Sequence, residues 1–323
     1  MPSVLVSIVT YNSAAHVTRC LQSLLGQKYT DFQVVVADNA SQDETIKAVR
    51  KFDVALLVNP SNLGFCTAHN RVIQQFQSDY VLVLNPDVQL APDFLRELVS
   101  AVKRDANIGT VCGKLLRLQR GNHANVIDSA GMVLRRNQRH LDRGAGKIDT
   151  GQYDTAGFVF GASGAAALYC REFVEDVRCG GDFFDSNFFA FREDADLSWR
   201  AQWLGWKCLY WPAAVAWHER RVTPERRRHL PPEINYHSVK NRFLMRIKNL
   251  DGRNYLRHFL PITVRDFGIF AYVLSREQSS LPAFSFVLKH YGEYYQLRKE
   301  LKRRRRVDSR IAGRWFEKEI EPL

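Results

Sequence analysis

The sequence predicts an α/β protein with a mostly parallel central sheet, helices on both faces of that sheet, and a helical extension at the carboxyl end. Three observations predict this fold. Strand-like and helix-like segments alternate over residues 3–84, as in sheets whose parallel strands are joined by helices. Beyond Pro232 the pattern is helical to about Arg306. The chain of 323 residues is also long enough for one large domain with an appendage.

The first part of the chain switches repeatedly between the two periodicities. Apolar, β-branched runs predict strands at 4–9, 32–37, 54–58 and 80–84. Amphipathic patterns predict helices at 16–25, 43–51 and 67–76, and a further helix begins beyond Ala91. Because the carboxyl ends of parallel strands share one edge of the sheet, the polar residues that follow the strands are expected to line a single crevice. These residues are Thr10, Tyr11 and Asn12, then 38–41, and then 59–62.

The middle of the chain is less regular. Residues 117–155 are polar and contain glycines, and 135–139 are expected in a mobile hairpin or loop. Residues 157–169 are small and apolar. A helix is predicted over 194–205, because acidic residues at its start suit the positive end of the helix dipole. Residues 207–217 are expected to form two short strands bent at Pro212.

Composition and charge divide the chain in two. With 46% hydrophobic and 25% charged residues, it is typical of a soluble globular protein. Up to His218 there are 22 basic and 22 acidic residues, whereas beyond it there are 24 and 12, so the whole excess of +12 lies in the second part. We therefore expect a neutral catalytic domain at 1–218 and a basic, mainly helical region at 219–323.

Cysteine usage and hydropathy indicate the compartment. The six cysteines are far apart and form no Cys-x-x-Cys pair, and the chain opens directly into a strand, so a reducing cytosol is expected. No run of 18 apolar residues occurs. The nearest candidate, 259–274, contains Pro261, Arg265 and Asp266 and should not span a bilayer.

Asp87 is the first candidate functional residue. The buried strand at 80–84 ends abruptly in Asn85-Pro86-Asp87, which presents Asp87 at the edge of the sheet where ligands bind. Taken alone, an Asp here is also an ordinary turn former or helix cap. The functional interpretation is favoured by a second acidic cluster, Glu193-Asp194-Ala195-Asp196, with His218 further along the chain.

Six segments, in this order, resemble family 2 glycosyltransferases, which have the GT-A fold, and within them the bacterial rhamnosyltransferase-like members. The resemblance covers roughly residues 3–218. Ala37, Ala40 and His69 depart from residues that are common in the family, which leaves the donor open. The segments are Ser7-Ile8-Val9-Thr10-Tyr11-Asn12, Val35-Val36-Ala37-Asp38-Asn39-Ala40-Ser41-Gln42-Asp43, Asn62-Leu63-Gly64-Phe65 with Asn70, Asn85-Pro86-Asp87, Gly161-Ala162-Ser163-Gly164-Ala165 and Glu193-Asp194-Ala195-Asp196-Leu197.

The resemblance implies a nucleoside-diphosphate sugar as donor. Tyr11 would pack against the base, and Asp38 would accept hydrogen bonds from the base or the ribose. Core packing for Tyr11 and a helix cap for Asp38 are the structural alternatives. The remaining residues expected around the donor are Thr10, Asn12, Asn62, Gly64, Asn70, Asn85 and Asp87. Gly64 is equally compatible with an ordinary turn.

The resemblance also implies a divalent metal, Mn²⁺ or Mg²⁺, held by Asp87 and His218. Asn85 stands where many members have the first acid of an Asp-x-Asp, so Asp87 brings the only formal charge of this motif. An imidazole ligand favours Mn²⁺. A lone His at a strand end is otherwise a solvated or packing residue. The metal would act as a Lewis acid on the departing diphosphate.

Asp194 is the expected general base of an inverting transfer, taking the proton of the acceptor hydroxyl. Like charges so close together should raise one pKa in the acidic cluster. The alternative is an acidic helix start without a catalytic duty. The residues expected on the acceptor side are Ser163, Gly164, Glu193 and Asp196, where the small size of the first two also fits close backbone packing.

The basic region suggests a surface partner. Its cations and aromatics favour contact with anionic lipid at the inner face of the cell membrane, for which the run 302–306 is the expected anchor. Packing against the catalytic domain, or against a second copy in a homo-oligomer, is the alternative. Nucleic acid is not expected as a partner, because no recognised module accompanies the charge.

Together these observations predict a metal-dependent inverting glycosyltransferase. By resemblance it would move rhamnose from dTDP-rhamnose to a growing bacterial cell-surface glycan, either a cell-wall polysaccharide or lipopolysaccharide, free or lipid-linked. One alternative is another donor, such as a UDP-hexose or UDP-galactofuranose. A second is a catalytically silent scaffold that binds sugar nucleotides or glycans. A nucleotidyltransferase is disfavoured, since Thr10-Tyr11-Asn12-Ser13 is not a glycine-rich basic loop.

Overall fold

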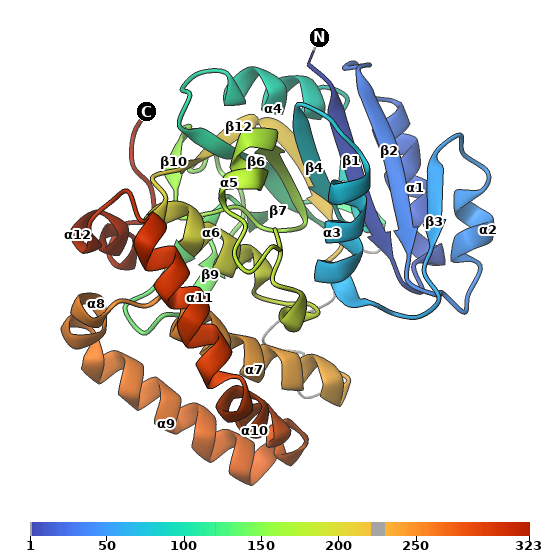
Figure 1. Cartoon of the computed structure of the whole chain (residues 1–323). Helices are drawn as coiled ribbons and strands as arrows, with labels where there is room; N and C mark the ends of the chain where they lie inside the picture. Colours follow the sequence, from blue (N-terminus) through green and yellow to red (C-terminus); the bar gives the residue numbers. More distant parts are fainter. Residues whose placement is uncertain (1, 120, 221–229) are drawn as a thin grey trace.

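The computed structural model describes residues 2–119, 121–220 and 230–323, which form a layered α/β body with helices packed beneath it (Figure 1). Its main sheet has ten strands in the described residues, and eight of them run side by side in the order β10-β12-β6-β11-β4-β1-β2-β3. The first half of this sheet is parallel: β1 (Val4–Thr10) lies between β2 (Phe32–Asp38) and β4 (Tyr80–Leu84), and β3 (Ala55–Val58) completes the edge. The mostly parallel α/β fold is confirmed.

Continuous apolar strands form here because both faces of the sheet are covered. Along β4, Val81 and Val83 belong to the core on one face, whereas Leu82 and Leu84 belong to the core on the other. Alternate residues of β4 thus point to opposite apolar layers, which is why the strand is apolar throughout. The helices of the first part are α1 (Ala14–Leu25), α2 (Thr45–Val49), α3 (Gly64–Gln75) and α4 (Phe94–Val102).

The second half of the sheet mixes directions. Strand β11 (Ala166–Cys170) runs antiparallel to both β4 and β6 (Ile108–Gln119). The polar segment forms β7 (Asn122–Ser129), and residues 135–139 join β8 (Met132–Leu134) to β9 (His140–Asp142) as the predicted hairpin. The remaining elements are β5 (Val88–Leu90), β10 (Gly157–Val159), α5 (Arg171–Asp176), the short helix η1 (Ser186–Phe188) and α6 (Glu193–Trp203).

One strand prediction is wrong. Residues 207–218 form a single strand, β12 (Lys207–His218), rather than two strands bent at Pro212. The strand runs parallel to β6, and its register shifts between Tyr210 and Val215. Pro212, which has no N–H to donate, lies within this irregular stretch. The bulge lets one strand continue to His218, and this places His218 at the edge that carries the site.

The C-terminal helices share the main hydrophobic core with the sheet. Leu244, Met245 and Tyr294 belong to the same buried cluster as Phe184 and Trp199. Helix α9 lies on the far side of α7 from the sheet (Figure 1). The helices are α7 (Pro232–Asn249), α8 (Gly252–Arg257), α9 (Phe259–Arg276), η3 (Gln278–Ser280), α10 (Pro282–Lys289), α11 (Tyr291–Arg304), α12 (Ser309–Gly313) and η4 (Arg314–Phe316). In the part of the chain that the structure describes, no helix is both long and apolar enough to cross a bilayer.

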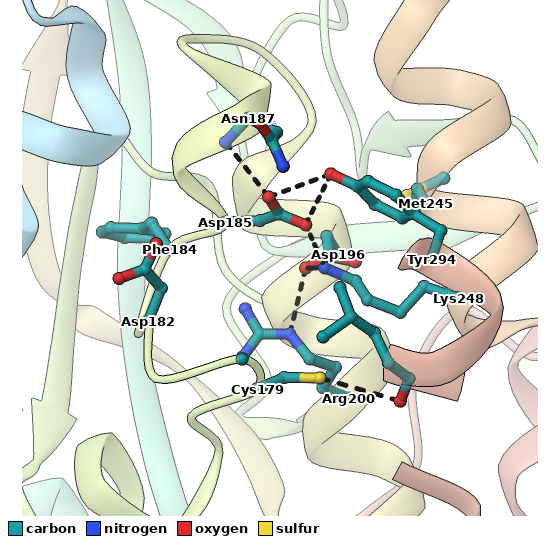
Figure 2. A network of polar contacts seen from close by, with 12 residues as sticks. Cys179, Asp182, Phe184, Asp185, Asn187, Asp196, Arg200, Met245, Lys248 and Tyr294 are labelled. Carbon is teal, nitrogen blue, oxygen red and sulfur yellow. Dashed lines mark hydrogen bonds and ion pairs between the residues drawn. The ribbon is translucent and has the colours of Figure 1, made fainter. Parts of the chain in front are cut away.

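A buried ionic network joins α6 to the C-terminal helices (Figure 2). Lys248 Nζ lies 2.5 Å from Asp185 Oδ2 and 2.9 Å from Asp196 Oδ2. Arg200 Nε pairs with Asp196 at 3.0 Å, and the Tyr294 hydroxyl lies 3.0 Å from both carboxylate oxygens of Asp185. Because all these groups lie out of solvent, each charge depends on its partners.

The substitution Lys248→Met should therefore destabilise the protein by about 3–5 kcal/mol, because it leaves two buried carboxylates to a single remaining arginine. The measurement is the free energy of unfolding from urea titration. Lys289→Met is the matched control, since Lys289 is exposed, and it should change stability by less than about 0.5 kcal/mol. Equal unfolding midpoints for the two variants would contradict this account of the network.

Candidate functional site

A large cavity of about 1280 Å³ lies where the strand ends meet the C-terminal helices. It is lined from β4, β9, the start of α6, the end of β12, and helices α7 and α9. Six residues singled out in the sequence line it together: Asn85, Asp87, Ser163, Glu193, Asp194 and His218. Segments more than a hundred residues apart are thus brought to one place.

Asp87 and His218 lie next to each other in the lining of this cavity. Asp87 follows β4, and His218 pairs with Val88 of the antiparallel strand β5, so the sheet register brings the two side chains together. His218 Nε2 lies 3.4 Å from Asp87 Oδ1. Burial raises the pKa of Asp87. The hydrogen bond and the charge of His218 together outweigh this effect, so the pKa lies below that of an ordinary Asp.

The other ring nitrogen of His218 is held by Asp128, which the sequence reasoning missed. His218 Nδ1 lies 2.8 Å from Asp128 Oδ2, and Asp128 is fully buried. Burial lowers the pKa of His218, yet Asp128 and Asp87 together raise it to about 9. Arg220 Nε reaches the second oxygen of Asp128 at 2.9 Å and pairs with Asp142 at 2.6 Å through its Nη2. The available signal was an acid directly after the apolar pair Val126-Ile127.

Asp87 and His218 fit a divalent metal. The buried Oδ1 of Asp87 faces His218 Nε2 at 3.4 Å and accepts no closer hydrogen bond from the described residues. Asp128 on the far nitrogen orients the ring as carboxylates do behind metal-bound histidines. The described residues contain no cluster of three or more His, Cys, Asp or Glu side chains that could hold a metal. Two protein ligands suit an ion whose other ligands are diphosphate oxygens and water.

Glu193 and Asp194 begin α6 after a strained turn, in which Phe189, Phe191 and Arg192 all have positive φ angles. Asp194 Oδ2 accepts a hydrogen bond from the Gly164 N–H at 3.2 Å. A Cβ atom at Gly164 would lie 3.6 Å from Asp194 Cβ and 3.7 Å from Glu193 Oε1, which are ordinary contact distances, so both carboxylates pack directly against this glycine without requiring it.

Both carboxylates resist ionisation. Burial raises the pKa of Asp194, as does the negative charge of Asp142, although the Gly164 N–H opposes this. Burial and the charge of Asp194 raise the pKa of Glu193 to about 8. At neutral pH the pair therefore keeps a proton, which Glu193 largely holds, while Asp194 is partly open to the cavity.

Asp196 does not belong with them. It is fully buried and bound by Arg200, Lys248 and the amide of Asn249, whose Nδ2 donates at 2.8 Å. It is not among the residues lining the cavity. The acceptor role expected for Asp196 is corrected to a structural one. On α6 the side chain of Asp196 points into the core, whereas that of Asp194 reaches the cavity.

The loops after β1 and β2 form one hydrogen-bonded unit. Asp38 is buried, and it accepts hydrogen bonds from Thr10 Oγ1 at 2.7 Å and from Ser41 N and Oγ at 2.8 and 2.6 Å. Asn12 Oδ1 accepts from the N–H of Gln42 at 2.8 Å. Tyr11 is 50% exposed, so it is not a core residue. This unit lies at the same sheet edge as Asp87, because β1 is the parallel neighbour of β4.

Asn62, Gly64 and Asn70 organise the start of α3. Asn62 Oδ1 accepts from the Gly64 N–H at 3.0 Å. Gly64 has φ +78°, and a Cβ there would lie 2.5 Å from the Phe189 ring. Asn70 is buried and forms two hydrogen bonds with the Phe184 backbone, at 2.7 and 2.9 Å. Asn70 therefore positions the segment that precedes α6 and does not line the cavity.

The comparison with protein families identifies the chain. Residues 5–178 match the model described as glycosyl transferase family 2. A curated relative, the N-acetylglucosaminyl-diphospho-decaprenol L-rhamnosyltransferase of Mycobacterium tuberculosis, is 32% identical over 241 residues, which cover 66% of this chain and 74% of that protein.

Solved structures share the fold. GalNAc-T7 with UDP, GalNAc and Mn²⁺ has a TM-score of 0.66 at 16% identity; the match covers 94% of this chain but only 55% of that chain. The mannosyltransferase PcManGT from Pyrobaculum calidifontis, in complex with GDP-Man and Mn²⁺, has a TM-score of 0.54 at 19% identity and covers 98% and 88%. The predicted GT-A fold is thereby confirmed, and the chain belongs to glycosyl transferase family 2 as a glycosyltransferase that takes its sugar from a nucleotide-sugar donor.

Proposed function

We propose that this protein is an inverting, metal-dependent glycosyltransferase that moves rhamnose from dTDP-rhamnose to a growing bacterial cell-surface glycan or its lipid-linked form. The observation that carries the proposal is that Asp87, His218 and Asp194 line one cavity although they come from three separate elements. The choice of rhamnose is supported by the mycobacterial relative, which is an L-rhamnosyltransferase by name.

The residues divide into two sides of the reaction. Asp87 and His218 would hold a divalent ion on the donor diphosphate, and this ion would supply Lewis-acid stabilisation of the departing group. Tyr11, half exposed at the sheet edge, would cover the base. The buried Asp38 would act on the donor through the loop that it shapes, since Thr10 and Ser41 already donate to its carboxylate.

Asp194 would serve the acceptor side. Its carboxylate would take the proton of an acceptor hydroxyl as that oxygen bonds to the anomeric carbon, while the bond from this carbon to the diphosphate breaks. Inversion follows because a single displacement occurs and no covalent sugar–enzyme intermediate forms. Ser163, which lines the cavity, and Gly164, whose N–H donates to Asp194, would border the acceptor.

Two alternatives make different predictions. A UDP-hexose or UDP-galactofuranose donor would leave the same chemistry in place. A silent binding scaffold would not require Asp194, and it is disfavoured because a carboxylate of raised pKa facing a cavity is typical of a catalytic base.

A thermal-shift panel tests the donor. The melting temperature should rise most with dTDP-rhamnose, compared with UDP- and GDP-sugars, and only when Mn²⁺ or Mg²⁺ is present, because binding to the native state stabilises it by mass action. A greater rise with a UDP-hexose would move the proposal to that donor, and equal shifts with and without metal would contradict metal-dependent binding.

The run 302–306, expected as the membrane anchor, is largely engaged within the protein, so a different surface is proposed for membrane contact. Three arginines of that run are engaged within the protein. Arg304 donates to the carbonyls of Asp176 and Arg178, Arg305 lies 3.9 Å above the Trp203 ring, and Arg306 pairs with Asp176 at 2.8 Å. The structure therefore favours the packing role for most of this run.

Helix α9 instead presents an apolar face to solvent. Leu260, Val264 and Phe267 are 70%, 63% and 73% exposed, and their spacing of four and three residues places them on one side of the helix. We propose that this face contacts the lipid surface at the inner side of the cell membrane, with the basic charge of residues 219–323 adding attraction to anionic lipid.

The double variant Leu260→Ser, Phe267→Ser should therefore lose most of its sedimentation with phosphatidylglycerol liposomes, because two exposed apolar contacts are removed. Lys302→Gln with Arg303→Gln should have a smaller effect. Ile148→Ser is the control, since Ile148 is 66% exposed outside these helices. Liposome binding by the double variant at the wild-type level would exclude the α9 face.

A further inference from the structure

The cavity contains a cluster of cations that the proposed donor chemistry does not use. Arg139 precedes β9, Arg192 precedes α6, Arg242 lies on α7 and Arg265 lies on α9, and all four line the cavity. Their charges meet at His140, whose pKa is held well below its ordinary value by burial and then by these same four arginines. Arginines from four separate parts of the chain thus lie close to His140.

This charge is poorly compensated. Arg242 is 1% exposed, and its Nη2 reaches Asp266 at 3.1 Å, but its Nε and Nη1 have no hydrogen-bond partner among the described residues. Asp266 is also shared with Arg246. Within residues 2–119, 121–220 and 230–323, the guanidinium groups of Arg139 and Arg265 form no hydrogen bond or ion pair. Burial and the charges of Arg242 and Arg139 lower the pKa of Arg265 to about 10.

The acids of the same cavity are committed elsewhere. Asp142 pairs with Arg220, and Asp87 pairs with His218. Glu193, with a pKa of about 8, is largely protonated at neutral pH. The buried Arg242 has only one carboxylate, shared with Arg246, as its ionic partner. The partly buried Arg139 and Arg265 have no ionic partner among the described residues, so a bound anion would relieve the repulsion among these cations. Guanidinium groups in particular present paired N–H donors that match phosphate oxygens.

An apolar wall adjoins the cluster. Val239 of α7 and Ile269, Tyr272 and Val273 of α9 line the same cavity, and three of these four pack in one small hydrophobic cluster. The opposite side of α9 carries the exposed apolar face described above. The cavity therefore combines carboxylates, a group of arginines and an apolar wall, which suits a ligand with an anionic head and an apolar chain.

We propose that Arg139, Arg192, Arg242 and Arg265 bind the phosphate or diphosphate of an acceptor that carries an apolar chain. The inference rests on the proposed function, since it takes the cavity beside Asp194 as the acceptor side. It names the acceptor class by its chemistry, which is a glycan joined through phosphate to a lipid, and not a free oligosaccharide.

Calorimetry with three probes tests this site without requiring turnover. Farnesyl diphosphate should bind more tightly than inorganic diphosphate and more tightly than farnesol, because only the first engages both the arginines and the apolar wall. The double variant Arg139→Gln, Arg265→Gln should weaken both diphosphate ligands by about tenfold or more and leave farnesol unchanged. Arg276→Gln, an exposed arginine at the end of the same helix, is the matched control.

A stability measurement shows that the double variant is folded. Because the two guanidinium groups repel neighbouring charges and pair with no described residue, removing them should raise the melting temperature of the free protein or leave it unchanged. A weaker ligand in a protein of equal or greater stability cannot be attributed to unfolding.

Nucleotide binding separates the two possible sources of the phosphate. Binding of dTDP or UDP with Mn²⁺ should be the same in wild type and in the double variant. An equal loss of nucleotide binding would assign the arginines to the donor and overturn the proposal. Failure of wild type to bind either diphosphate ligand, or equal binding by the double variant, would also overturn it, whereas nucleotide binding and Asp194-dependent transfer would still support the proposed function.

Discussion

Asp194→Asn is expected to lower turnover by about 10²–10⁴-fold, the usual contribution of a positioned general base, while leaving binding of the nucleotide sugar intact. The amide is the same size as the carboxylate and can still accept the hydrogen bond that the Gly164 N–H donates to Oδ2. It cannot take a proton. Steady-state turnover and donor affinity from calorimetry, measured on the same preparation, separate the two effects.

The pH dependence of kcat/KM is a second test of Asp194 as the base. Since burial raises the pKa of Asp194, the acidic limb of kcat/KM should lie above the range of an ordinary Asp. Glu193→Gln is the matched control on the neighbouring position; it should reduce turnover less and leave this limb nearly in place, because Glu193, with a pKa of about 8, is already largely protonated there. Turnover of Asp194→Asn within tenfold of wild type would place the base elsewhere.

Asp87→Asn should weaken Mn²⁺-dependent binding of the donor by about 100-fold or more, since losing even an outer-shell partner typically costs 10–100-fold. The substitution removes the charged group that faces His218 Nε2 at 3.4 Å. The measurement is calorimetry of the nucleoside diphosphate with and without Mn²⁺. The fold should persist, because the side chain lies at the sheet edge beside the cavity.

Two further variants sharpen this test. Asp128→Asn should weaken metal-dependent binding by about 10–100-fold, because it changes the partner of His218 Nδ1 without touching Asp87. Asp53→Asn, an exposed Asp after α2, should have no effect. If Asp87→Asn binds the nucleotide with unchanged dependence on Mn²⁺, the metal assignment fails.

Much of the fold was predictable from the sequence because its strands are buried on both faces. The runs at 4–9, 32–37, 54–58 and 80–84 are strands within one residue at each end. Their order along the chain also predicts that their carboxyl ends share an edge. Asn85, Asp87, Ser163, Glu193 and Asp194, which come from three of the six motifs, line one cavity together with His218, whereas Tyr11, Asp38, Asn62 and Gly64 of the first three motifs do not line it.

Reasoning from the sequence failed where it lacked the pairing register of a strand or the partner of a charged side chain. The bulge in β12 depends on pairing with β6, which lies about a hundred residues earlier. Asp194 and Asp196 are equivalent in the sequence as acids of a helix start. Only the packing of α7 against α6 shows that Asp196 is held by Lys248 and Asn249, while Asp194 is directed at Gly164.

The sequence by itself determined the layered α/β body, the helical extension, the family and the edge of the sheet where the donor chemistry belongs, since periodicity and motif order report local burial and chain order. The tertiary structure decided which charges are paired. Asp128 with His218, Arg306 with Asp176, and the arginine cluster around His140 each join residues that are far apart along the chain. A charge in a sequence carries no record of its distant partner, so an engaged arginine and an uncompensated one look alike until the helices and strands that carry them are packed.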